Sequence, residues 1–287
     1  MGAAQEAEGG FVADVPPAST PTLTSMALLD GKVALVSGAG PGLGRDIALA
    51  CGRQGATVAV AARTEARVEA IAAELEGLGA KALALRLDVC DPDSCRDAVE
   101  RVVETFGRLE VLVNNAFHAG DRTRFADADL DDWRRTMDVN LFGTLQLTQA
   151  CVAPMADRGD GRVVMVNSMS AVRMRPRFGA YTASKAALAA ATKILAVELG
   201  TQGIRVNGVH PGYIWGESVA MYFEHLARQK GITPDEQYAE VASETALGYL
   251  PPSSEIAEAV VFFASDMSKP ITGQALGVNA GHWLQGF

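Results

Sequence analysis

Short apolar runs alternate with longer amphipathic segments along most of this chain. We expect strands at 32–37, 57–61, 81–88, 111–113, 162–167, 205–209 and 275–278. We expect a first helix that ends near residue 53. Further helices are expected over 65–78, 91–106, 130–155, 178–199 and 253–264. Strands that are apolar on both faces must be covered on both sides, and strands joined through helices run parallel. The sequence therefore predicts an α/β fold, a single doubly wound domain with a parallel sheet of about seven strands and helices on both faces.

The charge balance and the cysteines exclude several classes of partner. The chain carries 25 Lys and Arg against 34 Asp and Glu, a net charge of −9, whereas nucleic acid and anionic membranes reward clustered positive charge. Cys51, Cys90, Cys95 and Cys151 have neither metal-ligand spacing nor the arrangement of a disulfide framework. No apolar stretch is long enough to span a membrane. We therefore expect no nucleic-acid or membrane partner, no bound metal, and a cytoplasmic protein with unpaired thiols.

A glycine-rich turn follows the first expected strand. It reads Ser37-Gly38-Ala39-Gly40-Pro41-Gly42-Leu43-Gly44. Glycines let the backbone approach a pyrophosphate, and the helix that follows directs its free N–H groups and the positive end of its dipole at the phosphates. The turn lacks the Gly-Lys-Ser/Thr of a P-loop. Its position between the first strand and the first helix indicates a dinucleotide site.

Tyr181 and Lys185 lie four residues apart in an expected helix, so the phenol and the ammonium group share one face. A tyrosine is a poor base at neutral pH because its ordinary pKa is about 10. A cation about 4 Å away would stabilise the phenolate by roughly 4 kcal/mol at an effective dielectric of about 20, which corresponds to about three pKa units. We therefore expect the pair to transfer protons beside a hydride carrier, with the pKa of Tyr181 lowered.

The order of these motifs resembles the short-chain dehydrogenase/reductase family over nearly all of residues 30–281. The other matching elements are Leu87-Asp88-Val89, Val113-Asn114-Asn115-Ala116, Asn140, Ser168 thirteen residues before Tyr181, and Gly203-Ile204-Arg205-Val206-Asn207 followed by Pro211-Gly212. The resemblance implies a Rossmann-type NAD(P)-dependent oxidoreductase. Such an enzyme moves a hydride reversibly between the nicotinamide and a small carbonyl or secondary alcohol substrate.

The resemblance also assigns roles to residues. Tyr181 is the expected general acid/base, with Lys185 lowering its pKa and binding the nicotinamide ribose. Ser168 is expected to donate a hydrogen bond to the substrate oxygen, and Asn140 to hold a proton-relay water against Lys185. Phe117 replaces a glycine of the family pattern and is expected to narrow the space beside the cofactor. The expected cofactor-binding residues are Gly38, Gly40, Gly42, Leu43, Gly44, Arg63, Asp88, Val89, Asn115, Tyr181, Lys185, Pro211, Gly212 and Ile214.

The end of the second expected strand bears on the choice of cofactor. An NAD enzyme places an acid there that binds the adenosine 2′-hydroxyl and repels a 2′-phosphate. This chain has the neutral Ala62, eighteen residues beyond Gly44, followed by Arg63. A guanidinium can pair with a phosphate through two hydrogen bonds while stacking on the adenine. We therefore expect NADP(H) to be preferred over NAD(H).

Two segments depart from the alternation of strands and helices. Residues 1–25 hold no Lys or Arg, three acids and a proline-rich run, which match neither a signal peptide nor a transit peptide. We expect a disordered N-terminal tail at 1–25 and one dinucleotide-binding and catalytic domain over 26–287. Residues 211–252 are rich in aromatic side chains and follow a strand that ends at the carboxyl edge of the sheet. We expect a substrate-binding lid there, which favours a substrate with apolar surface.

Several alternatives remain open. A catalytically silent nucleotide-sensing or scaffold protein could have the same fold, although it would not need Tyr181 and Lys185. An enoyl reductase of the related pattern would carry a lysine seven residues after the tyrosine, where this chain has Leu188. Arg173, Arg175 and Arg177 would either bind an acidic group of the substrate or lie in a solvated or subunit-contacting loop, and we favour the second reading.

The helices that start near Leu130 and Phe178 are apolar over more than one face. Small side chains, such as the alanines of 186–191, permit close approach between helices of different subunits. The resemblance implies a homotetramer, or else a dimer.

Overall fold

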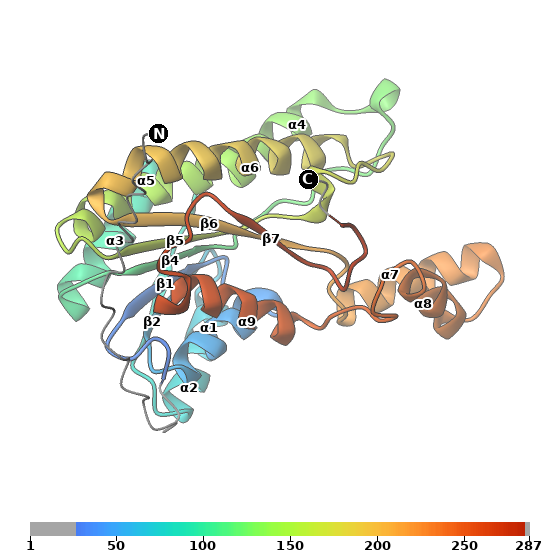
Figure 1. Cartoon of the computed structure of the whole chain (residues 1–287). Coiled ribbons are helices and arrows are strands. Elements are labelled where there is room, and N and C mark those ends of the chain that lie inside the picture. Colours follow the sequence, from blue (N-terminus) through green and yellow to red (C-terminus); the bar gives the residue numbers. More distant parts are fainter. Residues whose placement is uncertain (1–26, 285–287) are drawn as a thin grey trace, which may run out of the picture.

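The computed structural model describes residues 27–284, so the tail expected at 1–25 lies outside the described residues. A seven-stranded sheet forms the centre of the described chain (Figure 1). Its strands are β1 (Val33–Ser37), β2 (Thr57–Ala62), β3 (Ala82–Arg86), β4 (Val111–Asn114), β5 (Gly161–Val166), β6 (Ile204–Pro211) and β7 (Ala275–Val278). The order is β3-β2-β1-β4-β5-β6-β7, and all neighbouring pairs are parallel. The predicted doubly wound sheet is confirmed.

Successive residues of β1 face opposite layers, as the period of a strand requires. Ala34 and Val36 pack with α1 (Leu43–Arg53), α2 (Glu65–Gly77) and α9 (Ser253–Ala264). Val33 and Leu35 pack with α3 (Pro92–Phe106), α5 (Thr144–Ala156) and α6 (Gly179–Leu199). Figure 1 shows these two groups of helices on opposite faces of the sheet. The strands read as continuous apolar runs because both of their faces are buried.

The helical stretch expected at 130–155 is interrupted by one wide turn. α4 (Leu130–Met137) leads into a π-helical segment, Asp138–Gly143, and then into α5. Such bulges are often found at functional sites, and this one contains Asn140.

The strand order reverses at the boundary between β1 and β4. β1 is followed by α1 on one face, whereas β4 leads to helices on the other face. Loops that leave two such strands diverge and open a crevice at the carboxyl edge of the sheet. The glycine turn after β1 and the segment after β4 are the two walls of that crevice.

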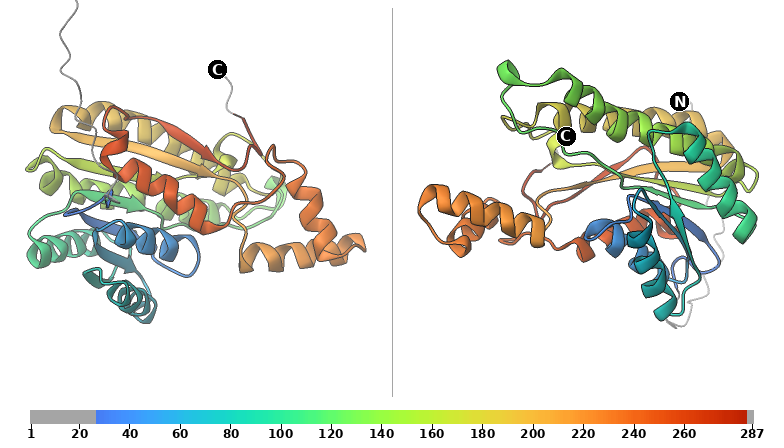
Figure 2. Two further views of the ribbon diagram at one scale, coloured as in Figure 1. Left: turned by 60° about the horizontal axis from the view of Figure 1, so that its bottom comes forward. Right: turned by 180° about the vertical axis from the view of Figure 1, so that it is seen from behind.

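Two helices, α7 (Glu217–Lys230) and α8 (Pro234–Ala242), make up most of the segment expected as a lid. They project from the carboxyl edge of the sheet, away from its two helical layers (Figure 2). The ends of the segment meet, because the Trp215 amide donates to the Pro251 carbonyl (2.8 Å). Phe223, Val241 and Leu250 form a small buried cluster of their own. The packing of the lid thus depends on its own core rather than on the main one.

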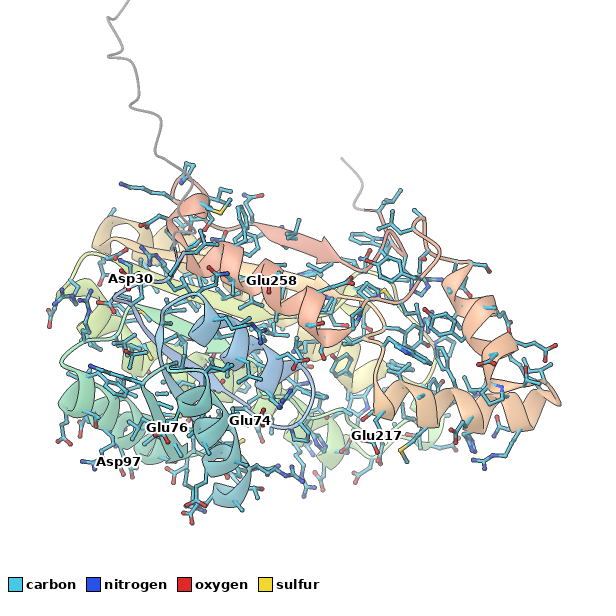
Figure 3. The ribbon with its side chains drawn as sticks, turned by 90° about the horizontal axis from the view of Figure 1, so that it is seen from below. Asp30, Glu74, Glu76, Asp97, Glu217 and Glu258 are labelled. Carbon is cyan, nitrogen blue, oxygen red and sulfur yellow. The ribbon has the colours of Figure 1, made fainter. Side chains whose placement is uncertain are left out.

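The acidic side chains that give the chain its net negative charge are distributed over several helices. Figure 3 shows Glu74 and Glu76 of α2, Asp97 of α3, Glu217 of α7 and Glu258 of α9 at the surface. Among residues 27–284, no helix is long and apolar enough to cross a membrane.

Candidate active site

The glycine turn runs from the carboxyl end of β1 into α1 and passes β4 at close range. At Gly38, φ is +69° and an added Cβ would lie 2.4 Å from the backbone nitrogen of Ala116, so only glycine fits. At Gly44, an added Cβ would lie 2.3 Å from the Gly38 carbonyl oxygen. The side-chain Nδ2 of Asn115, which directly follows β4, donates to that same oxygen (2.9 Å) and ties the turn to the end of β4. The turn is therefore held in one conformation by its neighbours.

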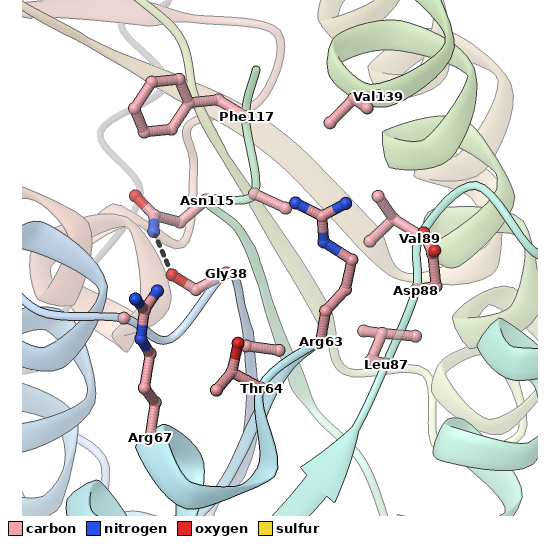
Figure 4. A pocket seen from close by; sticks show the side chains of 13 residues that line it. Gly38, Arg63, Thr64, Arg67, Leu87, Asp88, Val89, Asn115, Phe117 and Val139 are labelled. Atoms are coloured by element: carbon pink, nitrogen blue, oxygen red, sulfur yellow. Dashed lines mark hydrogen bonds between the residues drawn. The ribbon is translucent and has the colours of Figure 1, made fainter. Parts of the chain in front are cut away.

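A pocket lies between this turn and the ends of β2, β3 and β4 (Figure 4). No atom lies within 4 Å of the position that a Cβ would take at Gly40, so its backbone is open to a ligand. An open glycine backbone beside the start of a helix is the cradle that a pyrophosphate requires, and the residues present fit NAD(P). The lining residues are Gly38, Gly40, Ala62, Arg63, Thr64, Arg67, Leu87, Asp88, Val89, Asn115, Ala116, Phe117 and Val139.

The other expected cofactor-binding residues lie around this pocket rather than on its wall. Gly42, Leu43 and Gly44 form the start of α1. Pro211 ends β6, and Gly212 and Ile214 follow it at the carboxyl edge of the sheet. At Gly212 an added Cβ would lie 2.9 Å from the Asn279 side chain, so this residue is in close contact with the segment after β7.

Two basic side chains line the pocket where β2 leads into α2. Arg63 follows β2, and Arg67 lies in the first turn of α2. In Figure 4 the Arg63 side chain extends between Asn115 and Val89, and Arg67 extends toward the side where Gly38 lies. Arg67 was not among the residues expected to bind the cofactor, although its place in the first turn of the helix that follows Arg63 could have indicated it.

Ser168, Tyr181 and Lys185 come together beside the end of β5. Ser168 follows that strand, and the other two residues lie in the first turns of α6. The Lys185 ammonium group is buried, lies 5.8 Å from the centre of the Tyr181 ring and donates to the Val166 carbonyl (2.8 Å). The structure thus places the phenol, the hydroxyl and the ammonium group at one edge of the sheet.

The pKa values correct one expectation. The pKa of Tyr181 is raised above its ordinary value, because desolvation outweighs the hydrogen bond with Ser168 and the charge of Arg122. The expected lowering by Lys185 is therefore wrong for this geometry: the Lys185 ammonium group is directed to the Val166 carbonyl rather than to the phenol oxygen. Burial lowers the pKa of Lys185 itself to about 8.

Asn140 fixes the segment after β4 against α6. Its Oδ1 accepts from the His118 amide (2.6 Å), and its Nδ2 donates to the His118 carbonyl (2.9 Å) and to the Ser184 hydroxyl (2.9 Å). Both amide hydrogens are thereby used within the protein. Asn140 is fully buried, and its side chain positions the loop that begins with Phe117.

Phe117 is an exposed residue at the junction of the two halves of the site. It lines the dinucleotide pocket, and its ring packs edge-on against Tyr181, with centroids 6.4 Å apart. In the described part of the chain, no group of three or more His, Cys, Asp or Glu side chains is arranged to hold a metal ion.

Comparison with known proteins decides the family. A family model described as enoyl-(acyl carrier protein) reductase matches residues 38–282. L-rhamnose 1-dehydrogenase (NAD(P)(+)) of Sphingomonas sp. (strain SKA58) is 38% identical over 265 residues, which cover 90% of this chain and 99% of that protein. The chain belongs to the short-chain dehydrogenase/reductase family.

Solved structures agree with this assignment. NAD⁺-bound xylitol dehydrogenase has a TM-score of 0.81 at 28% identity and covers 87% of this chain and 98% of its own. A variant actinorhodin polyketide ketoreductase with NADPH also has a TM-score of 0.81, at 32% identity, and covers 88% of this chain and 97% of its own. This short-chain dehydrogenase/reductase is therefore an NAD(P)-dependent oxidoreductase, and nothing in the comparisons supports the catalytically silent alternative.

Proposed function

We propose that Tyr181 exchanges the proton and that Ser168 holds the substrate oxygen in a reversible carbonyl–alcohol interconversion. The observation that carries the proposal is the convergence of Ser168, Tyr181 and the buried Lys185 beside the end of β5, at the same sheet edge as the dinucleotide pocket. When bound, the nicotinamide supplies or accepts the hydride. Because the pKa of Tyr181 is raised, its phenol is protonated at neutral pH and can donate to a developing alkoxide.

The remaining residues of the site support this proton transfer. Lys185 places a buried cation on the same helix face as the phenol, where it can bind hydroxyl groups of a ribose. Asn140 holds the loop that bears Phe117 against α6 and so positions the wall between pocket and phenol.

The test compares Tyr181→Phe with Tyr249→Phe. The first variant removes the transferable proton and keeps the ring, so kcat should fall by about a hundredfold or more while cofactor binding, followed by nicotinamide fluorescence, stays unchanged. Tyr249 bonds Glu255 on the surface, and its variant should keep full turnover. A panel of ketones and alcohols with both cofactors supplies the assay. Substantial turnover by Tyr181→Phe would refute the assignment of the proton donor.

NADP(H) is the preferred cofactor in this proposal. Arg63, Thr64 and Arg67 supply two guanidinium groups and a hydroxyl at the adenosine end of the pocket, where Ala62 carries no charge. These are the donors that a 2′-phosphate requires.

The assembly is proposed to be a homotetramer, or else a dimer. Several large apolar side chains are exposed on α6, beside Asn140 and on β7, namely Ile194, Val197, Phe142 and Leu276. Exposed apolar groups of this size favour an interface with a second copy of the chain.

Three further expectations stay predictions. They are the tail at 1–25, the single domain over 26–287 with its lid at 211–252, and the cytoplasmic location. All four cysteines are free in the structure, as they would be in a reducing compartment.

A further inference from the structure

Two arginines beside the catalytic residues are held by aromatic rings rather than by carboxylates. The guanidinium carbon of Arg122 lies 3.9 Å from the centre of the Phe178 ring, and that of Arg175 lies 4.9 Å from the centre of the Tyr213 ring. Arg175 also donates to the Tyr213 hydroxyl. Neither guanidinium forms an ion pair with any carboxylate in residues 27–284.

Arg173 of the same loop is bound differently. Its guanidinium lies 2.8 Å from a Glu244 carboxylate oxygen, which also contacts His282 (3.0 Å). That arginine is neutralised and ties the loop to the segment after α8. The three alternating arginines of the sequence therefore do not share one role, and the choice between a substrate contact and a solvated loop must be made residue by residue.

Both aromatic-bound arginines come from segments that border Tyr181. Arg122 follows β4, and Phe178, on which it stacks, immediately precedes α6. The positive charge of Arg122 acts on the Tyr181 hydroxyl: it lowers the pKa of Tyr181, whereas desolvation raises it by a larger amount. Arg175 lies between Ser168 and α6 and reaches the first residues of the lid through Tyr213. Figure 1 shows the segments before α4 and before α6 converging near the start of α6.

The backbone of this loop is strained. Arg177 has φ of +68°, in the left-handed region that residues other than glycine rarely adopt. Strain of this kind costs free energy and is often found where a loop presents side chains to a ligand. Stacking on a ring leaves the edge N–H groups of a guanidinium able to donate, and these groups match the geometry of a carboxylate or phosphate. Within residues 27–284, Arg175 uses Nη1 for the Tyr213 hydroxyl and makes no hydrogen bond through its other nitrogens.

We propose that Arg122 and Arg175 bind a carboxylate or phosphate group of the substrate, so that the reacting carbonyl lies at Ser168 and Tyr181. The inference rests on the proposed hydride-transfer function and names its substrate class. The aromatic side chains of the segment 211–252 were expected to favour a substrate with apolar surface. Phe223, Trp215 and Tyr238 instead pack on one another, so they give no support to an apolar substrate.

The kinetic test uses matched substrates. Short oxo acids are compared with their methyl esters, and dihydroxyacetone phosphate with dihydroxyacetone. In the wild-type enzyme, kcat/KM should be at least about tenfold higher for the charged member of a pair, which is the scale of one charge-assisted hydrogen bond. Arg122→Gln and Arg175→Gln should each remove most of that advantage, so that kcat/KM falls far more for the charged member than for the neutral member. The two kinds of pair distinguish a carboxylate from a phosphate.

Arg124→Gln is the control, because Arg124 is an exposed arginine two residues from Arg122. It should change neither member of any pair. Equal kcat/KM for charged and neutral members in the wild type would overturn the proposal and leave hydride transfer intact. An equal loss for both members in the arginine variants would overturn it as well.

A binding measurement makes the result independent of turnover. Malonate is titrated calorimetrically into protein saturated with NADP(H), so that the basic groups around Arg63 are occupied. Arg122→Gln and Arg175→Gln should weaken malonate binding about tenfold, and Arg124→Gln should not. Unchanged affinity in both variants would refute the anion site, whereas failure of Tyr181→Phe to slow turnover bears on the proposed function alone.

Discussion

Lys185 is a charged group that the fold buries beside Tyr181. Within residues 27–284 its ammonium group donates to one acceptor, the Val166 carbonyl, and burial lowers its pKa from 10.5 to about 8. Desolvation has this effect because it disfavours the charged form. Lys185 therefore loses its proton at a mildly alkaline pH, in a range where an enzyme can be assayed.

We expect the loss of this proton to limit activity. As pH rises through about 8, Lys185 loses the charge and one of the N–H donors with which it is proposed to bind the ribose, so kcat/KM for carbonyl reduction should fall with an apparent pKa near that value. A Lys185→Arg variant that retains turnover should lack this decline, since a guanidinium stays charged. The measurement is a pH profile from 6 to 10. A wild-type profile that stays flat beyond pH 9 would contradict the role given to the cation.

Deprotonation of Lys185 does not destabilise the folded protein, so unfolding caused by this group cannot explain a fall of kcat/KM with rising pH. The pKa of Lys185 is about 8 in the folded state and 10.5 in its ordinary environment, so between these values the unfolded state binds more protons. The contribution of Lys185 to the free energy of unfolding therefore rises with pH between about 8 and 10.5. Melting temperatures recorded along the profile therefore separate deprotonation of Lys185 from loss of structure.

At the scale of elements, the junction of β2 and α2 contributes Arg63, Thr64 and Arg67 to the dinucleotide pocket, and we expect it to select the cofactor. Arg63→Ala should raise the KM for NADP(H) by about tenfold or more and leave the KM for NAD(H) nearly unchanged, because a bidentate contact to a 2′-phosphate is lost. Arg67→Ala should act in the same direction, since its side chain lines the same pocket. Arg53→Ala, in the last turn of α1, is a control outside the pocket. Equal losses for both cofactors, or a wild-type preference for NAD(H), would refute the assignment.

Periodicity and motif order were sufficient to predict the sheet, its parallel strands and the helices on both faces. Asp91 shows why local signals worked: it follows the third strand, and its side chain caps α3 by accepting from the Asp93 amide. The pKa of Tyr181 could not be predicted, because it depends on the direction in which the Lys185 side chain turns and on desolvation. Arg122 could not be found either, since only the folded chain brings its loop to Phe178.

The lid has a core that can be altered separately. Phe223 is buried among Tyr213, Trp215 and Tyr222, outside the two clusters that cover the sheet. Phe223→Ala should remove about 3–5 kcal/mol of packing from this small cluster. We expect the substrate KM to rise severalfold while cofactor affinity is retained, because the glycine turn and its pocket lie on another element. Steady-state kinetics and nicotinamide fluorescence measure the two effects.

Met221 provides the control for the lid. It lies two residues before Phe223 on α7 and is 61% exposed, so Met221→Ala should change neither parameter. If Phe223→Ala weakened the cofactor as much as the substrate, the lid would not be an independent unit.

At the scale of the whole molecule, the two helical layers differ in what they leave exposed. On the layer with α3 and α5, α6 presents Ile194 and Val197 to solvent at 52% and 75% exposure. These residues are three positions apart and so lie on one face of the helix. Phe142, at 51%, belongs to the helical segment that packs beside α6. An apolar surface of this kind is stabilised when a second subunit covers it.

Val197→Glu should therefore change the assembly. A charge placed in a desolvated interface costs far more than it does on an open surface, so the variant should shift the protein toward smaller species at micromolar concentration. Leu78→Glu is the matched control: Leu78 is an apolar residue with 53% exposure that follows α2 on the opposite layer, and its replacement should leave the mass unchanged. Multi-angle light scattering distinguishes a tetramer, a dimer and a monomer. A monomeric wild type would refute the assembly, and a Val197→Glu variant of unchanged mass would show that α6 is not its interface.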